Sequence, residues 1–145
     1  RRTIRAVGWT NEENGMRGGN AYRDAHQHET HQLAIESDGG VFSPLGFGFT
    51  GSPAARAIVT AIGSLLNPIN AGKIEASGGG ADIGPIMATG VPGMGLNVDG
   101  TRYFWFHHTD ADTPDKLDRA EVQRCVAVMA VMAYIAADLE QGLPR

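Results

Sequence analysis

The sequence is short of cysteine, of basic charge and of long hydrophobic runs, and each shortage excludes a class of protein. A single cysteine, Cys125, allows no internal disulfide, and its apolar surroundings indicate an inert core thiol. The 12 lysines and arginines are scattered and outnumbered by 16 acidic residues, so neither nucleic acid nor an anionic membrane is an expected partner. No run of about eighteen apolar residues indicates a membrane span.

The beginning of the chain lacks a targeting pattern. It opens on Arg1 and enters a strand-like segment at once, so we expect it to be the later part of a longer protein. Any leader would then lie upstream of Arg1, and the missing pattern is no argument against secretion. Localisation therefore has to be inferred from other features.

Short apolar runs alternate with helical patterns along the 145 residues, of which 42% are hydrophobic. This alternation predicts one α/β domain in which helices cover a sheet. The strands are expected at residues 3–10, 31–37, 45–50, 73–76 and 94–98, and the helices at 17–26, 53–66, 82–89 and from 119 onward.

Two helix starts have clear capping residues. Ser52 can cap a helix that begins at Pro53, and Asp118 with Glu121 has the spacing of a capping box. We expect both helices to bury one apolar stripe in the core. The predicted stripes are Ile58, Ile62, Leu65 and Leu66 in the first helix, and Val122, Cys125, Val126, Met129, Met132, Ala133 and Ala136 in the last.

The tripeptide Asn11-Glu12-Glu13 is the strongest indication of chemistry. It follows the apolar run of residues 4–9, at the end of the first predicted strand, where ligands of open α/β sheets gather. Neighbouring side chains diverge, so one carboxylate can bind a metal while the other faces the water that the metal activates. Asp38 likewise follows a predicted strand. A solvated charge patch is the competing interpretation, because glutamates are mostly exposed.

Histidines and carboxylates gather again in a second segment, residues 103–113. If its first half is extended, His107 and His108 point to opposite faces and only one of them reaches a shared site. Asp110 or Asp112 could orient a metal-binding imidazole, since such rings usually donate their second N–H to a carboxylate or carbonyl. The remaining histidines, His26, His28 and His31, are expected at the surface.

Three familiar motifs are incomplete in this chain. Gly46–Gly51 has the spacing of a dinucleotide-binding loop, but phenylalanines alternate with its glycines as in a strand. Residues 110–121 match some positions of a calcium loop, yet Asp115 stands where that loop needs its glycine. Gly78–Gly80 lacks the lysine of a nucleotide-triphosphate loop. A nucleotide-binding domain is therefore the weakest of the functional hypotheses.

Four segments occur in an order that is typical of one family. They are Trp9–Gly18, with the Asn-Glu-Glu motif, Ile35–Asp38, Gly79–Pro85, and His108–Thr113, with a His-Thr-x-x-Asp-Thr pattern. Together they resemble the co-catalytic di-zinc exopeptidases, and most closely the carboxypeptidase Q branch, over essentially the whole chain. The resemblance implies a three-layer αβα sandwich with a mixed sheet, in which two zinc ions are held at strand ends.

The resemblance also assigns roles to individual side chains. By match to the Asn-Glu-Glu motif, Glu12 is expected to be the general base and Glu13 a ligand of one zinc ion. Asp38 is expected to bind the other zinc ion, and His108, not His107, to share the zinc ion of Glu13. Behind these ligands or in the substrate pocket we expect Asp82, Tyr103 and Asp112.

The chain supplies only three of the five ligands that the family pattern needs. By resemblance, a histidine and the bridging aspartate lie upstream of Arg1, so residues 1–145 are expected to be the C-terminal portion of the catalytic domain. We expect this portion alone to bind zinc weakly and to be inactive, because a bridging carboxylate holds the two cations together. Missing upstream strands would leave a sheet edge or an apolar face uncovered.

The whole protein is expected to hydrolyse dipeptides or the amino-terminal bonds of peptides. The resemblance implies a secreted or periplasmic location and allows a homodimer. Two other hypotheses keep the fold and change the function. One is a non-catalytic binding domain, against which the intact site residues argue. The other is an enzyme like glutaminyl cyclase, with one zinc ion and a similar acidic pair.

Overall fold

Four short strands form one mixed sheet in the order β1-β4-β2-β3. In the computed structural model, which describes all 145 residues, they are β1 (Ala34–Glu36), β2 (Pro44–Thr50), β3 (Lys73–Glu75) and β4 (Gly93–Val98). β1 runs parallel to β4, β4 antiparallel to β2, and β2 parallel to β3. Four of the five predicted strands are therefore confirmed, with ends that differ by up to a few residues.

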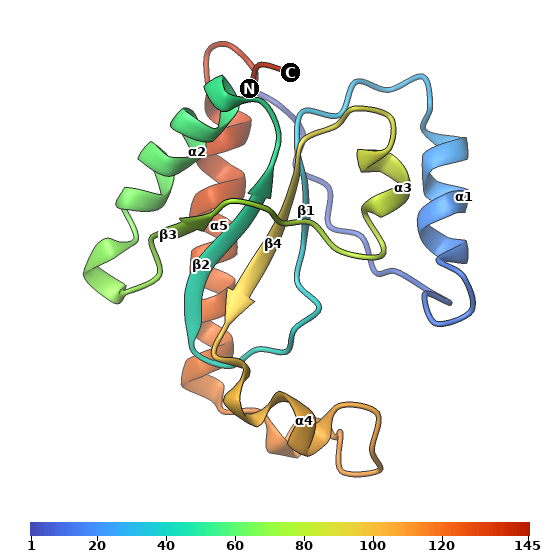
Figure 1. Ribbon diagram of the computed structural model, residues 1–145, viewed down its shortest axis with the longest axis vertical. Coiled ribbons are helices and arrows are strands. Elements are labelled where there is room, and N and C mark those ends of the chain that lie inside the picture. Colours follow the sequence, from blue (N-terminus) through green and yellow to red (C-terminus); the bar gives the residue numbers. More distant parts are fainter.

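Helices lie on both sides of this sheet (Figure 1). α2 (Pro53–Ser64) and α5 (Arg119–Asp138) cover one face, and α1 (Arg17–Ala25) and α3 (Gly84–Met87) lie on the other side, near β1. α4 (Tyr103–Phe106) follows the end of β4. Three 3₁₀ turns complete the chain: Asn67–Ile69, Gly100–Arg102 and Pro114–Lys116. The expected αβα sandwich with a mixed sheet is thus confirmed.

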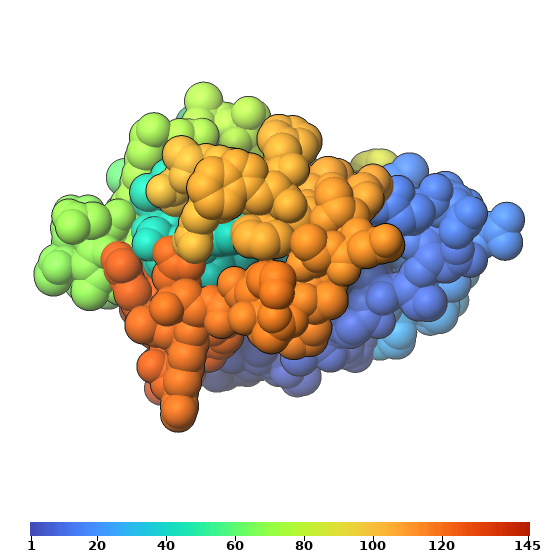
Figure 2. Space-filling model, turned by 90° about the horizontal axis from the view of Figure 1, so that it is seen from below, coloured from blue at the N-terminus to red at the C-terminus, as the bar shows by residue number.

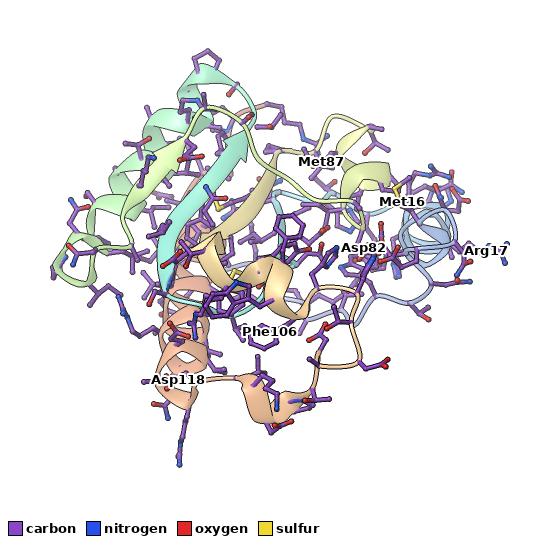
Figure 3. All side chains as sticks on the ribbon, turned by 60° about the horizontal axis from the view of Figure 1, so that its bottom comes forward. Met16, Arg17, Asp82, Met87, Phe106 and Asp118 are labelled. Carbon is purple, nitrogen blue, oxygen red and sulfur yellow. The ribbon has the colours of Figure 1, made fainter.

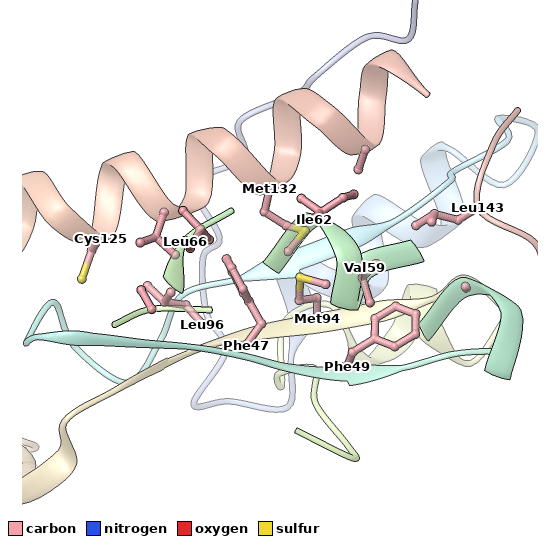
Figure 4. Packing of buried hydrophobic residues seen from close by; sticks show 14 residues of the cluster. Phe47, Phe49, Val59, Ile62, Leu66, Met94, Leu96, Cys125, Met132 and Leu143 are labelled. Carbon is pink, nitrogen blue, oxygen red and sulfur yellow. The ribbon is translucent and has the colours of Figure 1, made fainter. Parts of the chain in front are cut away.

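One face of the sheet, which we call the core face, carries large apolar side chains. β2 contributes Phe47 and Phe49, β4 contributes Met94 and Leu96, and all four are buried against α2 and α5 (Figure 4). Residues i and i+2 of a strand share a face, so alternate positions suffice to build this layer. The helices complete the cluster with Ala55, Val59, Ile62, Cys125, Val128, Met132 and Ala136.

The opposite face, which we call the glycine face, permits close approach of backbone. Gly48 of β2 pairs with Gly95 of β4, and the segment Ser77–Gly79 crosses directly over this pair. A Cβ on Gly48 would collide with the carbonyl oxygen of Ser77, and one on Gly95 with that of Gly79. The glycines therefore let the connection from β3 to α3 lie flat on the sheet.

Both predicted helix caps are present. Ser52 Oγ accepts a hydrogen bond from Ala55 N (3.1 Å), and Asp118 Oδ1 accepts one from Glu121 N (2.9 Å). The second half of the predicted capping box is wrong, because the Glu121 carboxylate accepts from Arg102 (2.6 Å) and not from the cap. That ion pair ties the beginning of α5 to the turn before α4.

The predicted core stripes of α2 and α5 are correct only in part. Leu65 and Val126 are 62% and 61% exposed, whereas Val59 and Val128 are fully buried. Each helix contacts the sheet along one side, so the angle at which it crosses the strands decides which edge of its apolar stripe is covered. The stripe residues that are buried as predicted are Ile62, Leu66, Cys125, Met132 and Ala136.

The strand predicted at residues 3–10 is wrong. This segment is largely exposed and pairs with no strand. It is held instead near its ends, where Arg2 N donates to Ala137 O of α5 (3.1 Å) and Gly18 N donates to Thr10 O (3.0 Å). An apolar run becomes a strand only when it pairs with a neighbour in a sheet, and none of the four strands pairs with this run.

By length and composition alone, α5 is also long and apolar enough to cross a membrane. One side of it packs on the sheet, where Cys125 is buried as predicted and its thiol donates to Phe42 O (3.0 Å). α5 therefore lies as an outer helix of the sandwich, with one side on the sheet and the other, including Val126 and Tyr134, exposed.

Candidate functional site

Glu12 and Glu13 lie in a tight turn that leads into α1. Asn11 and Met16 both have left-handed backbone conformations, with φ of 60° and 53°. The amide of Met16 donates to the carbonyl of Glu12 (2.7 Å), which closes the turn, and Asn14 Nδ2 donates to Asn11 Oδ1 (2.7 Å). Asparagine tolerates left-handed backbone better than most residues, which explains its place before the two glutamates.

Aromatic and charged contacts hold the segment before this turn against α1. Trp9 packs edge-on against Tyr22 of α1, with ring centroids 5.3 Å apart. Arg5 donates to the Tyr22 hydroxyl (2.8 Å) and pairs with Glu29 (3.0 Å). The two glutamates therefore keep a defined place although no strand precedes them. Two of the histidines predicted at the surface, His26 and His31, belong to the same cluster.

The aromatic segment before His108 is helical, so the extended geometry considered for it is wrong. α4 ends at Phe106, and His108 has a left-handed backbone with φ of 57°. The rings of His107 and His108 consequently stack, with centroids 3.8 Å apart, and do not point to opposite faces. A left-handed conformation costs a residue other than glycine about 1–2 kcal/mol, and such strain clusters at functional sites.

The acidic turn and His108 meet in space. His108 Nε2 lies 2.7 Å from Glu13 Oε1, a contact between residues 95 positions apart. The side chains are 61% and 67% exposed. Figure 2 shows N-terminal residues beside those around position 110 at one end of the molecule. A carboxylate oxygen and an imidazole nitrogen are two of the ligand types that zinc takes.

Asp38 lies at the same end of the sheet without joining that contact. It follows β1, which is parallel to β4, and it lines a pocket of about 230 Å³ with Glu36 and residues 78–81. No three His, Cys, Asp or Glu side chains are grouped closely enough to hold a metal ion. The structure thus brings together two of the three predicted ligands, Glu13 and His108, and leaves the third nearby.

Glu12 is surrounded by other carboxylates. Its pKa is raised, first by partial burial and then by the charges of Glu13, Asp82 and Asp38. The charge of His108 lowers the pKa of Glu12. Carboxylates in one region disfavour each other's ionisation. A glutamate with a raised pKa is better suited than an ordinary one to take up a proton near neutral pH.

Tyr103 and Asp112 flank the same region. Burial raises the pKa of the Tyr103 hydroxyl, and the charges of Asp38, Glu13 and Asp112 raise it further. Tyr103 also lines a second pocket, of about 430 Å³, together with the 80% exposed ring of Phe104. The predicted pocket residue Tyr103 therefore lies near the carboxylates of Glu13, Asp38 and Asp112 and also lines the larger pocket.

Glu36 is a buried carboxylate that the sequence analysis missed. It is 5% exposed on β1, and its Oε2 accepts from Ile83 N (2.8 Å), which fixes the segment that carries Asp82. Burial raises the pKa of the Glu36 and Asp82 carboxyl groups, and each group has one fully buried oxygen without a hydrogen-bond partner. Asp82 precedes α3 and lies between Met16 and Phe106 in Figure 3. The available signal was strand period, because Glu36 lies two residues before Asp38.

A family model described as Peptidase family M28 matches residues 1–133. The chain belongs to peptidase family M28. Carboxypeptidase Q from Xenopus laevis is 44% identical to it over 147 aligned residues, and carboxypeptidase Q from Homo sapiens is 42% identical over the same length. Each alignment covers the whole chain and 31% of the relative. The chain thus spans about a third of the length of these relatives.

A solved structure of the M28 family shares the fold. The crystal structure of a Peptidase M28 precursor from Shewanella amazonensis SB2B matches with a TM-score of 0.83 and 31% sequence identity. The match covers 94% of this chain and 32% of the other. The mixed sheet and its helices therefore match about a third of that larger M28 structure.

Proposed function

We propose that the chain is the C-terminal portion of the catalytic domain of a zinc exopeptidase that hydrolyses dipeptides or the amino-terminal bonds of peptides. Membership of peptidase family M28 supplies the reaction class, and the carboxypeptidase Q relatives favour an exopeptidase. The observation that carries the residue-level proposal is the contact between Glu13 and His108, which unites two predicted ligands from distant parts of the chain.

Zinc fits the donor chemistry of this region. Carboxylate oxygen and imidazole nitrogen are common zinc ligands, and Glu13, Asp38 and His108 offer both. In this proposal Glu13 and His108 hold one of two zinc ions and Asp38 holds the other. Zinc bound there would lower the pKa of a coordinated water toward about 7 and would polarise the scissile carbonyl. The remaining ligands come from outside residues 1–145.

Glu12 is the proposed general base. It is adjacent to Glu13 in a turn of fixed shape, so it stands beside the proposed ligands without being one of them. Its raised pKa favours proton uptake near neutral pH. The same carboxyl group then delivers that proton to the leaving amine, and the charges of Asp82 and Asp38 help to keep its pKa high.

The pocket beside Tyr103 suits one side chain of a small peptide. It adjoins the smaller pocket of Asp38, because both are lined by Gly39, Leu96 and Asn97. Apolar walls with a few polar groups at one end are usual for small-ligand sites. Its apolar lining consists of Leu45, Leu96, Val98, Tyr103 and Phe104.

We further propose that the whole protein is secreted or periplasmic and that it can act as a homodimer.

The full-length protein carrying Glu12→Gln tests the role of the base. We expect its turnover of a dipeptide to fall by about 10²–10⁴-fold, the usual contribution of general acid–base catalysis, while its zinc content stays unchanged. Glu140→Gln, which changes an exposed glutamate far along the chain, is the control and should behave as the wild type. Near-normal hydrolysis by the Glu12→Gln protein would remove Glu12 from this role.

The 145-residue chain on its own should bind zinc weakly and hydrolyse nothing, since it offers three proposed ligands and no bridging carboxylate. Titration of the purified chain with zinc, followed by calorimetry, measures this directly. Tight uptake of two zinc ions per chain would contradict the proposed division of the ligands. In the full-length protein, His108→Ala should abolish binding of one zinc ion.

A further inference from the structure

His107 is the histidine beside the candidate site to which the proposed mechanism gives no role. Its ring stacks on two others: its centroid lies 4.4 Å from that of Tyr103 and 3.8 Å from that of His108, and both interplanar angles are 23°. Tyr103 and His108 stack on His107 and not on each other. His107 is therefore the middle ring of three that lie nearly parallel.

The backbone explains why these rings stack. Tyr103 and His107 are four residues apart, which is the spacing at which side chains of a helix meet, and His107 N donates to Tyr103 O (3.0 Å). His108 follows with its left-handed backbone, which places its ring against that of its neighbour. The stack is thus built from the last turn of α4 and the residue that reverses the chain.

The His108 imidazole has few other restraints. It is 61% exposed, and its hydrogen-bonding contact is the one between Nε2 and Glu13 Oε1. An exposed side chain with a single polar contact exchanges rotamers readily. The face of the ring that packs on His107 therefore supplies the second contact needed to fix its direction.

We propose that His107 is a positioning residue: its ring, held against Tyr103, keeps the His108 imidazole in the orientation in which Nε2 points at Glu13. The orientation itself depends only on the three rings. Its consequence for zinc rests on the proposed function, because a ligand that is held in place binds a metal more tightly than a mobile one.

Crystal structures of the zinc-free full-length protein carrying His107→Ala or His107→Phe test the orientation without any metal. Phenylalanine keeps a flat ring for stacking, so His108 should keep its rotamer in His107→Phe and lose it in His107→Ala. His28→Ala, which removes an exposed histidine elsewhere, is the matched control and should leave His108 unchanged. An unchanged His108 rotamer in His107→Ala, or a displaced one in His107→Phe, would overturn the proposal.

Zinc affinity of the same proteins, measured by competition with a chromogenic chelator, tests the consequence. His107→Ala should weaken the affected zinc site by about 10-fold, as loss of an outer partner of a ligand does, and His107→Phe should restore it. Equal affinity of His107→Ala and the wild type would contradict the consequence. If His108→Ala itself leaves zinc binding intact, the proposed metal site is wrong, while the crystal structures still decide the role of His107.

Discussion

The core face and the glycine face belong to the same strands and differ in almost every property. Phe47 and Phe49 on the core face are fully buried against α2 and α5, whereas Gly48 between them has no side chain and meets the backbone of Ser77–Gly79. Because strand residues alternate between faces, two adjacent positions of β2 serve opposite purposes. One face is filled by large side chains, and the other is closed by a second segment of backbone.

The two faces also differ in charge on the neighbouring strand β1. On β1, Ile35 packs with the apolar cluster, while the next residue, Glu36, lies on the glycine face in register with Gly95. Glu36 accepts from Ile83 N and so fixes the segment that carries Asp82, one of the carboxylates near Glu12. The core face therefore provides stability, and the glycine face positions acidic groups at a cost in stability.

The largest effect should follow from emptying the core face. Phe47→Ala removes a fully buried ring from between β2 and the helices, and we expect the free energy of unfolding to fall by about 3–5 kcal/mol. Urea denaturation measures this loss. Leu45→Ala, on the same strand at a side chain that is 45% exposed, is the control and should cost about 1 kcal/mol or less. Similar losses for the two variants would show that the core face is not the main source of stability.

The elements that the sequence predicts well are those with local signals. The helix at α2 follows from Ser52 and Pro53, and that at α5 from Asp118, because a cap depends on residues within one turn. The segment at residues 3–10 has the composition of a strand, but a strand needs a distant partner, and none of the four strands pairs with this segment. Exposure of Val126 depends in the same way on a packing angle that no local pattern specifies.

The candidate site shows the same limit. Motif order and family resemblance indicated Glu13 and His108, and the turn conformation at Asn11 suits the residue type. The stack of His107 on His108 required a left-handed residue at the end of α4, which histidine composition does not predict. Glu36 was missed because only the strand period, which places it two residues before Asp38, indicates its position, and a lone glutamate is not otherwise expected to be buried.

The second-largest loss of stability should follow from adding a side chain on the glycine face, where the Ser77–Gly79 segment lies close to the strands. Gly48→Ala places a methyl group against Ser77 O, and because backbone atoms cannot rotate away, we expect a loss of about 1–3 kcal/mol in the free energy of unfolding. Gly84→Ala, at the first position of α3, meets no atom within 4 Å and should be neutral or stabilising by about 0.4–1 kcal/mol. A neutral Gly48→Ala variant would mean that the crossing segment moves freely.

The smallest effect concerns the electrostatic cost of Asp82, whose segment is fixed by Glu36 on the glycine face. Burial and the charge of Asp38 raise the pKa of Asp82 above its ordinary value of 3.8. Between pH 3.8 and the raised pKa, the native state therefore keeps a proton that the unfolded chain has lost. Because the native state then binds more protons, this group lowers the free energy of unfolding as the pH rises through the raised pKa. Asp82→Asn cannot titrate, so its stability relative to the wild type should increase across that window and then level off. Urea denaturation at a series of pH values measures the difference, with the lowest pH, where both side chains are neutral, as the internal reference. A difference that stays constant with pH would mean that the glycine face imposes no such cost at Asp82.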